Sequence, residues 1–188
     1  MIINQASKTK KEETTMATKK SIWVLFGILA ISAWVLGSAI QAEAETLKYK
    51  FYTYVIRGEN NLIGDVEGHL FWHHVREAFY AFENGEVATV TAIVSGDFIG
   101  TSGTFMQYVT VNFEDGSTII IKSQGTGGTP PAGTTTAGWK SEIIKGTGRF
   151  QGIKGTHTAK AKYLPLQKGE IGQKGYGEGT FTYTLPSK

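Results

Sequence analysis

No cysteine occurs in the chain, and only four of its 188 residues are proline. Without disulfides the fold must be held together by its buried side chains, and about 144 residues after the N-terminal segment can bury enough surface for this. Glycine is frequent, with 24 residues, and β-branched and aromatic residues recur in short runs between turn signals. This composition is typical of an all-β protein, either a sandwich or a barrel.

Clusters of basic residues interleaved with aromatic ones are also missing. The first 44 residues hold five of the 19 Lys and Arg and three of the 16 Asp and Glu, so the remainder has a net charge of +1. The isoelectric point near 9.0 therefore mostly reflects the N-terminal segment. We predict no nucleic-acid partner.

A single long uncharged segment, residues 21–41, follows Lys19 and Lys20 near the N-terminus. A basic start, an apolar run and the small-residue sequence Ala42-Glu43-Ala44 are typical of a secretory signal peptide, cleaved after Ala44. The run is also close to the roughly 20 apolar residues that span a bilayer, so an uncleaved anchor is the alternative. We expect residues 1–44 to be an extension with a signal helix, and residues 45–188 to be one exported domain, periplasmic, secreted or in the cell envelope. Only an uncleaved N-terminal segment would contact a membrane.

Eight segments of the remaining chain carry strand signals. They are residues 47–57, 66–82, 87–94, 103–113, 117–122, 139–144, 156–164 and 177–185. Asn84-Gly85 and Asp115-Gly116 predict hairpins, and a two-residue loop at the second places Glu114 opposite Ser117 and Val111 opposite Ile120. Both faces of this hairpin are then partly apolar, which a homo-oligomer or a sandwich would explain.

Residues 123–138 are rich in Gly, Thr and Pro and show no apolar periodicity. Connections longer than about 12–15 residues are usually functional or disordered. Two interpretations stay open here, a lid over the mouth of a barrel and the tip of a hairpin.

The glycine-rich segment Gly146–Gly155 is the most informative motif of the chain. We expect a short helical turn between two strands, capped by Thr147 and ended by Gly155 in the left-handed conformation. Phe150 and Ile153 fall on one face of such a turn and can plug one end of a barrel. The glycine spacing does not match a nucleotide-binding loop.

The sequence Gly-Thr-Gly-x-Phe-x-x-x-x-Gly in this segment resembles a turn of the allene oxide cyclase and dirigent proteins. The rhythm of short strands extends the resemblance over residues 46–185, as for an exported member of bacterial type. The resemblance implies an eight-stranded antiparallel β-barrel of lipocalin-like shape, with one short helical turn. It also implies a cavity for a small hydrophobic molecule and no cofactor. Trp139-Lys140 stands where plant dirigent proteins have an Arg-Glu pair, so the substrate is not carried over.

Three of the four histidines lie in residues 67–77. On a strand Glu67, His69 and His73 share one face. This face is either a polar, solvent-facing one in which His and Glu neutralise each other, or it turns into a small barrel, where these three residues are our candidates for proton transfer or hydrogen bonding. Trp72, His74 and Arg76 share the opposite face as the second candidates. Glu142, on a later strand, is a further catalytic candidate if it is buried.

No metal site is predicted, because His69 and His73 would be roughly 13 Å apart on a regular strand. Aromatic residues with polar tips can line an apolar pocket, and the candidates for ligand binding are Tyr52, Tyr54, Trp72, Tyr108 and Trp139. We expect a barrel that binds a small hydrophobic molecule. It is either a cofactor-independent isomerase or cyclase, or a non-catalytic carrier or an envelope-associated binding or structural protein.

Overall fold

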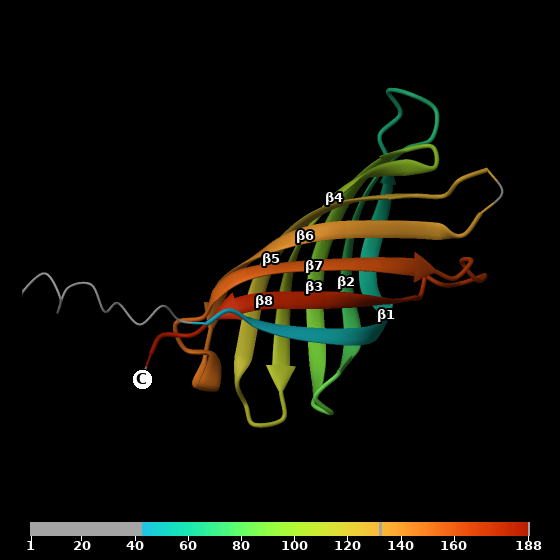
Figure 1. The fold of residues 1–188 in the computed structure, drawn as a ribbon. Coiled ribbons are helices and arrows are strands. Elements are labelled where there is room, and N and C mark those ends of the chain that lie inside the picture. The colour runs from blue at the N-terminus through green and yellow to red at the C-terminus, as the bar shows by residue number, and fades with distance from the viewer. Residues whose placement is uncertain (1–42, 132, 188) are drawn as a thin grey trace, which may run out of the picture. The chain divides into compact units, whose positions relative to one another are not determined.

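Side chains that alternate between buried and exposed run along most of the chain after Glu45 and build eight long strands. The computed structural model describes residues 43–131 and 133–187. Neighbouring strands are antiparallel and the sheet closes between β1 and β8 (Figure 1). The elements are β1 (Glu45–Leu62), β2 (His69–Phe82), β3 (Val87–Ile99), β4 (Ser102–Phe113), β5 (Thr118–Gly128), β6 (Thr135–Gly146), the 3-10 turn η1 (Gly148–Phe150), β7 (Lys154–Tyr163) and β8 (Gly175–Thr184). The expected all-β, eight-stranded antiparallel barrel is confirmed.

The expected signal helix lies outside the described residues. Within residues 43–131 and 133–187, no helix has the length and apolar character needed to cross a bilayer. The placement of the domain boundary at residue 44 stays a prediction.

One end of the barrel is filled by aromatic side chains and closed by the glycine-rich segment. Phe150 and Ile153 are both buried, and the Phe150 ring lies 4.8 Å from the Phe113 ring inside the barrel. The prediction that these two side chains plug the barrel is confirmed. We call this end, with the connections after β2, β4 and β6, the plugged end.

Two details of the glycine-rich segment were predicted wrongly. The Thr147 side chain does not cap η1; its hydroxyl accepts a hydrogen bond from the backbone N–H of Thr118 instead. The left-handed glycines are Gly148 and Gly152, with φ of 58° and 77°, rather than Gly155. The turn is thus fastened to β5 and not only to its own backbone.

The predicted register of the β4–β5 hairpin was wrong by one residue. The N–H of Phe113 donates to the carbonyl of Ser117, which leaves a three-residue loop that ends in Gly116 at φ 79°. Val111 therefore pairs with Ile119 rather than Ile120. Because side chains alternate, the shift turns Ile119 into the barrel and Ile120 out of it.

Residues 123–138 are mostly strand, contrary to the expected irregular connection. β5 continues to Gly128 and β6 begins at Thr135, so only the hairpin tip between them is irregular. Small side chains at this end leave room inside the barrel. Figure 1 shows this hairpin and the β7–β8 connection at the end opposite the plug, which we call the cavity end.

Phe150→Ala should lower the free energy of unfolding by about 3–5 kcal/mol, because it empties a buried site in the plug. Phe79→Ala is the matched control, since Phe79 is half exposed on the outer face and its loss should change stability by about 0.5 kcal/mol or less. Urea unfolding of both variants measures the difference. Equal losses in the two variants would contradict the assignment of Phe150 as the plug.

Candidate functional site

β2 places a different set of polar side chains on each side of the barrel wall. Trp72, His74 and Arg76 point into the barrel, whereas His69 and His73 lie on the outer face. The second set of candidates from the sequence is thus the inward one. The site is built on these inward side chains.

The four predicted catalytic residues do not come together and none of them lines the interior. Glu67 is exposed in the turn before β2, and His69 and His73 follow on the outer face. Glu142 is exposed on the outer face of β6. None of the four therefore has the position inside the barrel that proton transfer to a bound molecule would need.

His69 instead makes ion pairs on the surface of the barrel. Its Nδ1 lies 2.5 Å from Asp65 and its Nε2 lies 2.8 Å from Asp97. The hydrogen bonds to these two carboxylates raise the pKa of His69 above its ordinary value of 6.5. This pairing joins the β1–β2 connection to β3.

The predicted ligand-binding aromatics divide in the same way. Trp72 and Trp139 line a cavity inside the barrel. Tyr52, Tyr54 and Tyr108 are exposed on the outer face, and the Tyr54 hydroxyl donates to Glu77 there. The alternation that turns Tyr49 and Phe51 inward on β1 places Tyr52 and Tyr54 outside, and Val109 does the same for Tyr108 on β4.

The cavity lies inside the cavity end and has a volume of about 560 Å³. Its surface is mostly apolar, with Leu70, Phe98 and Phe105 among its walls. Ligand pockets typically have volumes of about 300–1,000 Å³, an apolar lining and few polar groups. The polar side chains that line it are Asn60, His74, Arg76, Gln107, Gln173 and Tyr163, with four threonines, Thr101, Thr129, Thr135 and Thr136. We call this space the mouth cavity.

His74 is held in a defined orientation in the wall of the mouth cavity. Its ring stacks on Trp72 at 4.6 Å and its Nε2 lies 2.9 Å from Oδ1 of Asn60. Asn60 uses its amide N–H to bond the carbonyl of Ile171, so its Oδ1 accepts and His74 donates from Nε2. Burial, the positive charge of Arg76 and His73 lower the pKa of His74 to about 4. His74 is therefore neutral at pH 7, and the lone pair on its Nδ1 is a hydrogen-bond acceptor but only a weak base.

Arg76 brings a positive charge to the same cavity. One Nη2–H donates to the carbonyl of Gln173 at 2.7 Å, and Nε–H reaches the Thr53 hydroxyl at 3.4 Å. The guanidinium lies over the Tyr163 ring, 5.3 Å from its centre. Burial lowers the pKa of Arg76 from its ordinary value, but an arginine remains charged at neutral pH.

The β7–β8 connection, residues 164–174, covers part of the mouth cavity, and we call it the cover segment. Leu166 and Ile171 of this segment line the cavity. The side chains of Asn60 and Arg76 hold its carbonyls, and the Lys174–Glu170 ion pair closes the segment on itself at 2.6 Å. The same two side chains thus line the cavity and fasten its cover.

A second polar network is sealed in the core, deeper than the mouth cavity. The Tyr49 hydroxyl lies 2.6 Å from Nε2 of His157, whose Nδ1 lies 2.8 Å from Ser141. Ser141 donates to Ser123, so its oxygen accepts from Nδ1–H of His157 and the Tyr49 hydroxyl donates to Nε2. Ser141 is thus not activated as a nucleophile, since a catalytic histidine would have to accept its proton.

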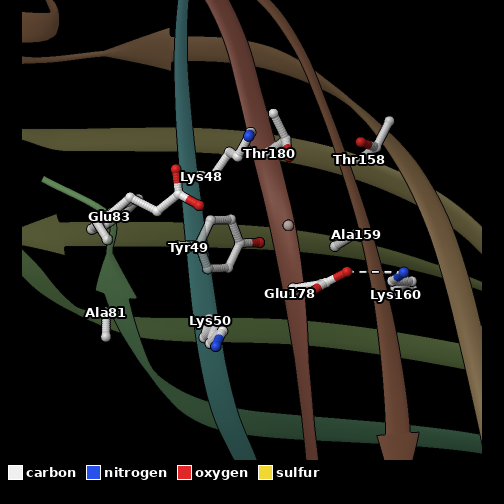
Figure 2. A pocket seen from close by; sticks show the side chains of 12 residues that line it. Lys48, Tyr49, Lys50, Ala81, Glu83, Thr158, Ala159, Lys160, Glu178 and Thr180 are labelled. Atoms are coloured by element: carbon white, nitrogen blue, oxygen red, sulfur yellow. Dashed lines mark ion pairs between the residues drawn. The ribbon is translucent and has the colours of Figure 1, made fainter.

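This network needs Gly179 in the neighbouring strand. A methyl group at Gly179 would collide with the Tyr49 hydroxyl. Figure 2 shows the Tyr49 ring beside β1 with its hydroxyl directed toward β8. The missing side chain lets Tyr49 reach across to His157.

The outer surface over these strands forms a shallow hollow with charged rims (Figure 2). Lys48, Lys50 and Glu83 border it, and Lys160 and Glu178 form an ion pair across it at 2.9 Å. An exposed, charged hollow of this kind cannot withdraw an apolar molecule from water. The mouth cavity is the better candidate for binding.

No group of three or more histidine, aspartate and glutamate side chains among residues 43–131 and 133–187 is arranged to hold a metal ion. The polar side chains of the mouth cavity are amides, hydroxyls, an imidazole and a guanidinium. They suit hydrogen bonding and anion recognition rather than metal ligation.

The sequence signal for the site was incomplete. His74 and Arg76 were recognised as one face of β2, but Asn60, Gln107 and Tyr163 were not singled out. Asn60 lies beyond residues 47–57, where the first strand was expected, whereas β1 continues through it to Leu62. A bulge between Val55 and Arg57 changes the parity of the strand there, which no pattern in the sequence reveals.

Comparisons with known proteins find a similar fold and little else. No protein-family model matches the chain, and no curated protein sequence matches it. The pterocarpan synthase dirigent protein GePTS1 matches with 14% identity and a TM-score of 0.45, over 80% of this chain and 95% of the other. The pterocarpan synthase dirigent protein PsPTS1 matches with 18% identity and a TM-score of 0.44, over 79% and 100%. Similarities at this level carry no argument about activity.

The buried His157 should make the barrel sensitive to acid. Burial lowers its pKa from 6.5 to about 3, so between these pH values the unfolded chain binds a proton that the folded chain does not. Stability should therefore fall by several kcal/mol as the pH drops from 6.5 toward 3. His157→Gln should be less stable than wild type at pH 7 but lose less on acidification, as measured by urea unfolding at a series of pH values.

His69→Gln is the control, because the contribution of His69 to stability should change with pH in the opposite direction to that of His157. The raised pKa of His69 stabilises the fold below pH 6.5, and this contribution is lost as the pH rises through the folded pKa. The variant should be destabilised at pH 5.5 relative to wild type and less so at pH 9. Identical pH profiles for wild type and His157→Gln would show that His157 does not govern the acid response.

Proposed function

We propose that this barrel binds a small, largely hydrophobic molecule in the mouth cavity. The observation that supports the proposal is a cavity of about 560 Å³ with a mostly apolar surface and a few fixed polar groups inside a closed barrel. Barrels of about eight strands have room for side chains alone or for one small ligand. Here the plugged end is filled by side chains and the cavity end is not.

The cavity is a more probable ligand site than a packing defect because its polar groups are oriented. Asn60 and Arg76 bind the backbone of the cover segment, and His74 is fixed by Asn60 and Trp72. Groups that are held in place before a ligand arrives lose little conformational freedom on binding. The arrangement therefore supports selective binding rather than mere exclusion of water.

Catalysis is the second candidate function, and His74 is the observation that favours it. The neutral imidazole of His74 can accept a hydrogen bond from an acidic group of a bound molecule, and the positive charge of Arg76 stabilises the anion that forms when that group loses its proton. That combination suits a cofactor-independent isomerisation or cyclisation. A carrier needs only the cavity, so loss of turnover with intact binding in His74→Gln would identify an enzyme.

Export, the cleaved signal peptide and a homo-oligomer remain predictions from the sequence. The exposed Ile93, Met106 and Tyr108 lie on the outer faces of β3 and β4, where a second subunit would cover apolar surface. Sedimentation of residues 45–188 would measure the oligomeric state directly.

The uncharged fluorescent probe N-phenyl-1-naphthylamine should bind the wild-type barrel with one site and a rise in emission. Ala137→Phe should weaken this binding at least about tenfold, since it adds a ring to the cavity wall. Ala81→Phe is the matched control, because Ala81 lies on the outer face of β2. It should leave the affinity unchanged.

Two outcomes would contradict the proposed function. One is the absence of saturable probe binding to the folded wild type, and the other is equal binding by Ala137→Phe and Ala81→Phe. If the probe binds as expected, mass spectrometry of material that co-purifies with residues 45–188 from the native host would identify the natural ligand. Thermal unfolding of both variants checks that the added ring has not simply unfolded the barrel.

A further inference from the structure

We infer that the molecule bound in the mouth cavity carries a carboxylate, and that Arg76 binds this carboxylate while the apolar walls hold its hydrocarbon part. The inference rests on the proposed function and adds the chemical class of the ligand. It follows from the state of Arg76, which is charged, turned inward and incompletely satisfied.

Arg76 has no ion-pair partner among the described residues. The ion pairs of that part of the chain all involve other side chains, on the outer face, in the plugged end or in the cover segment. A cation taken out of water without a counter-charge costs free energy, so such groups are normally paired. The missing negative charge is what a ligand can supply.

The hydrogen bonds of Arg76 leave its outer end free. A guanidinium has five N–H donors, of which one on Nη2 goes to Gln173 and the one on Nε goes to Thr53. Both hydrogens of Nη1 and the second hydrogen of Nη2 have no protein acceptor. No polar side-chain atom of the described residues is both sealed from solvent and without a partner, so Nη1 borders open space. Arg76 lines the mouth cavity, so a molecule bound there can reach these free N–H groups.

The free hydrogens have the geometry of a carboxylate site. Adjacent N–H groups on Nη1 and Nη2 can donate to the two oxygens of one carboxylate in parallel. A phosphate or sulfate monoester would bring more charge and more oxygens, yet Arg76 is the only Lys or Arg among the residues that line this cavity. His74 adds no second positive charge, because it is neutral at pH 7. One planar head with a single negative charge fits best.

The remainder of the cavity suits an apolar tail. Arg76 is the last of the β2 residues that line it, counted from the cavity end, after Leu70, Trp72 and His74. Phe98 and Phe105 continue the wall on the neighbouring strands β3 and β4. An acid with a hydrocarbon chain or an aromatic ring can thus place its head at Arg76 and keep its tail against these side chains.

The test compares two probes of equal chain length, decanoate and decan-1-ol, as competitors of N-phenyl-1-naphthylamine. Wild type should bind decanoate about ten to a hundred times more tightly than decan-1-ol, the range expected for a hydrogen-bonded charge. Arg76→Met should lose this preference and still bind the uncharged probe. Arg76→Lys keeps the charge but not the paired donors, so it should keep part of the preference for decanoate over decan-1-ol.

Arg57→Met is the matched control, since Arg57 is exposed on β1. It should leave the preference for decanoate at the wild-type value. Thermal unfolding of both variants checks that they fold, since Arg76→Met also loses the hydrogen bonds to Gln173 and Thr53.

The results separate this inference from the proposed function. If the uncharged probe binds but decanoate and decan-1-ol compete equally in wild type, the carboxylate assignment is wrong while the cavity stands. An unchanged preference in Arg76→Met would overturn it equally. If no probe binds the wild type, the proposed function itself has failed. The comparison of decanoate with decan-1-ol in wild type tests the carboxylate assignment even if a variant does not fold.

Discussion

The pairing of β1 with β8 is the constraint on which the rest of this structure depends. It removes both edges of the sheet, so every strand must turn one face inward and the other to the outside. The interior of an eight-stranded barrel is narrow, and a few large side chains fill it. Aromatic rings and the Phe150 plug occupy one half, and the other half keeps the mouth cavity. Closure therefore decides both where the core lies and where a ligand can enter.

Much of this fold could be read from local patterns, because each strand carries its own alternation and each hairpin its own glycine. The plug was predictable from Phe150 and Ile153, three residues apart between glycines. The register of the β4–β5 hairpin was not predictable, since Asp115-Gly116 fits a two-residue loop as well as the three-residue loop that forms. One added residue exchanged the faces of Ile119 and Ile120. Such a choice depends on the neighbouring strands rather than on the turn itself.

The candidate site was harder to predict because β2 has polar residues on both faces. His69 and His73 alternate with His74 and Arg76, and the pattern alone does not say which pair turns inward. In β1 the alternation that turns Tyr49 and Phe51 inward also places Tyr52 and Tyr54 on the outside. A ligand site is found more reliably from the face shared with the core than from the chemistry of single residues.

The mouth cavity combines two features that do not stabilise a fold by themselves, an unfilled volume and an unpaired guanidinium. Their coincidence is the main reason to assign a function to this end of the barrel. A crystal structure with 10-bromodecanoate tests the assignment most directly, because the anomalous signal of bromine locates the tail. The account predicts bromine between the aromatic walls of the cavity and the carboxylate oxygens at hydrogen-bond distance from Nη1 and Nη2 of Arg76. Bromine on the outer face, or a carboxylate bound away from Arg76, would contradict it.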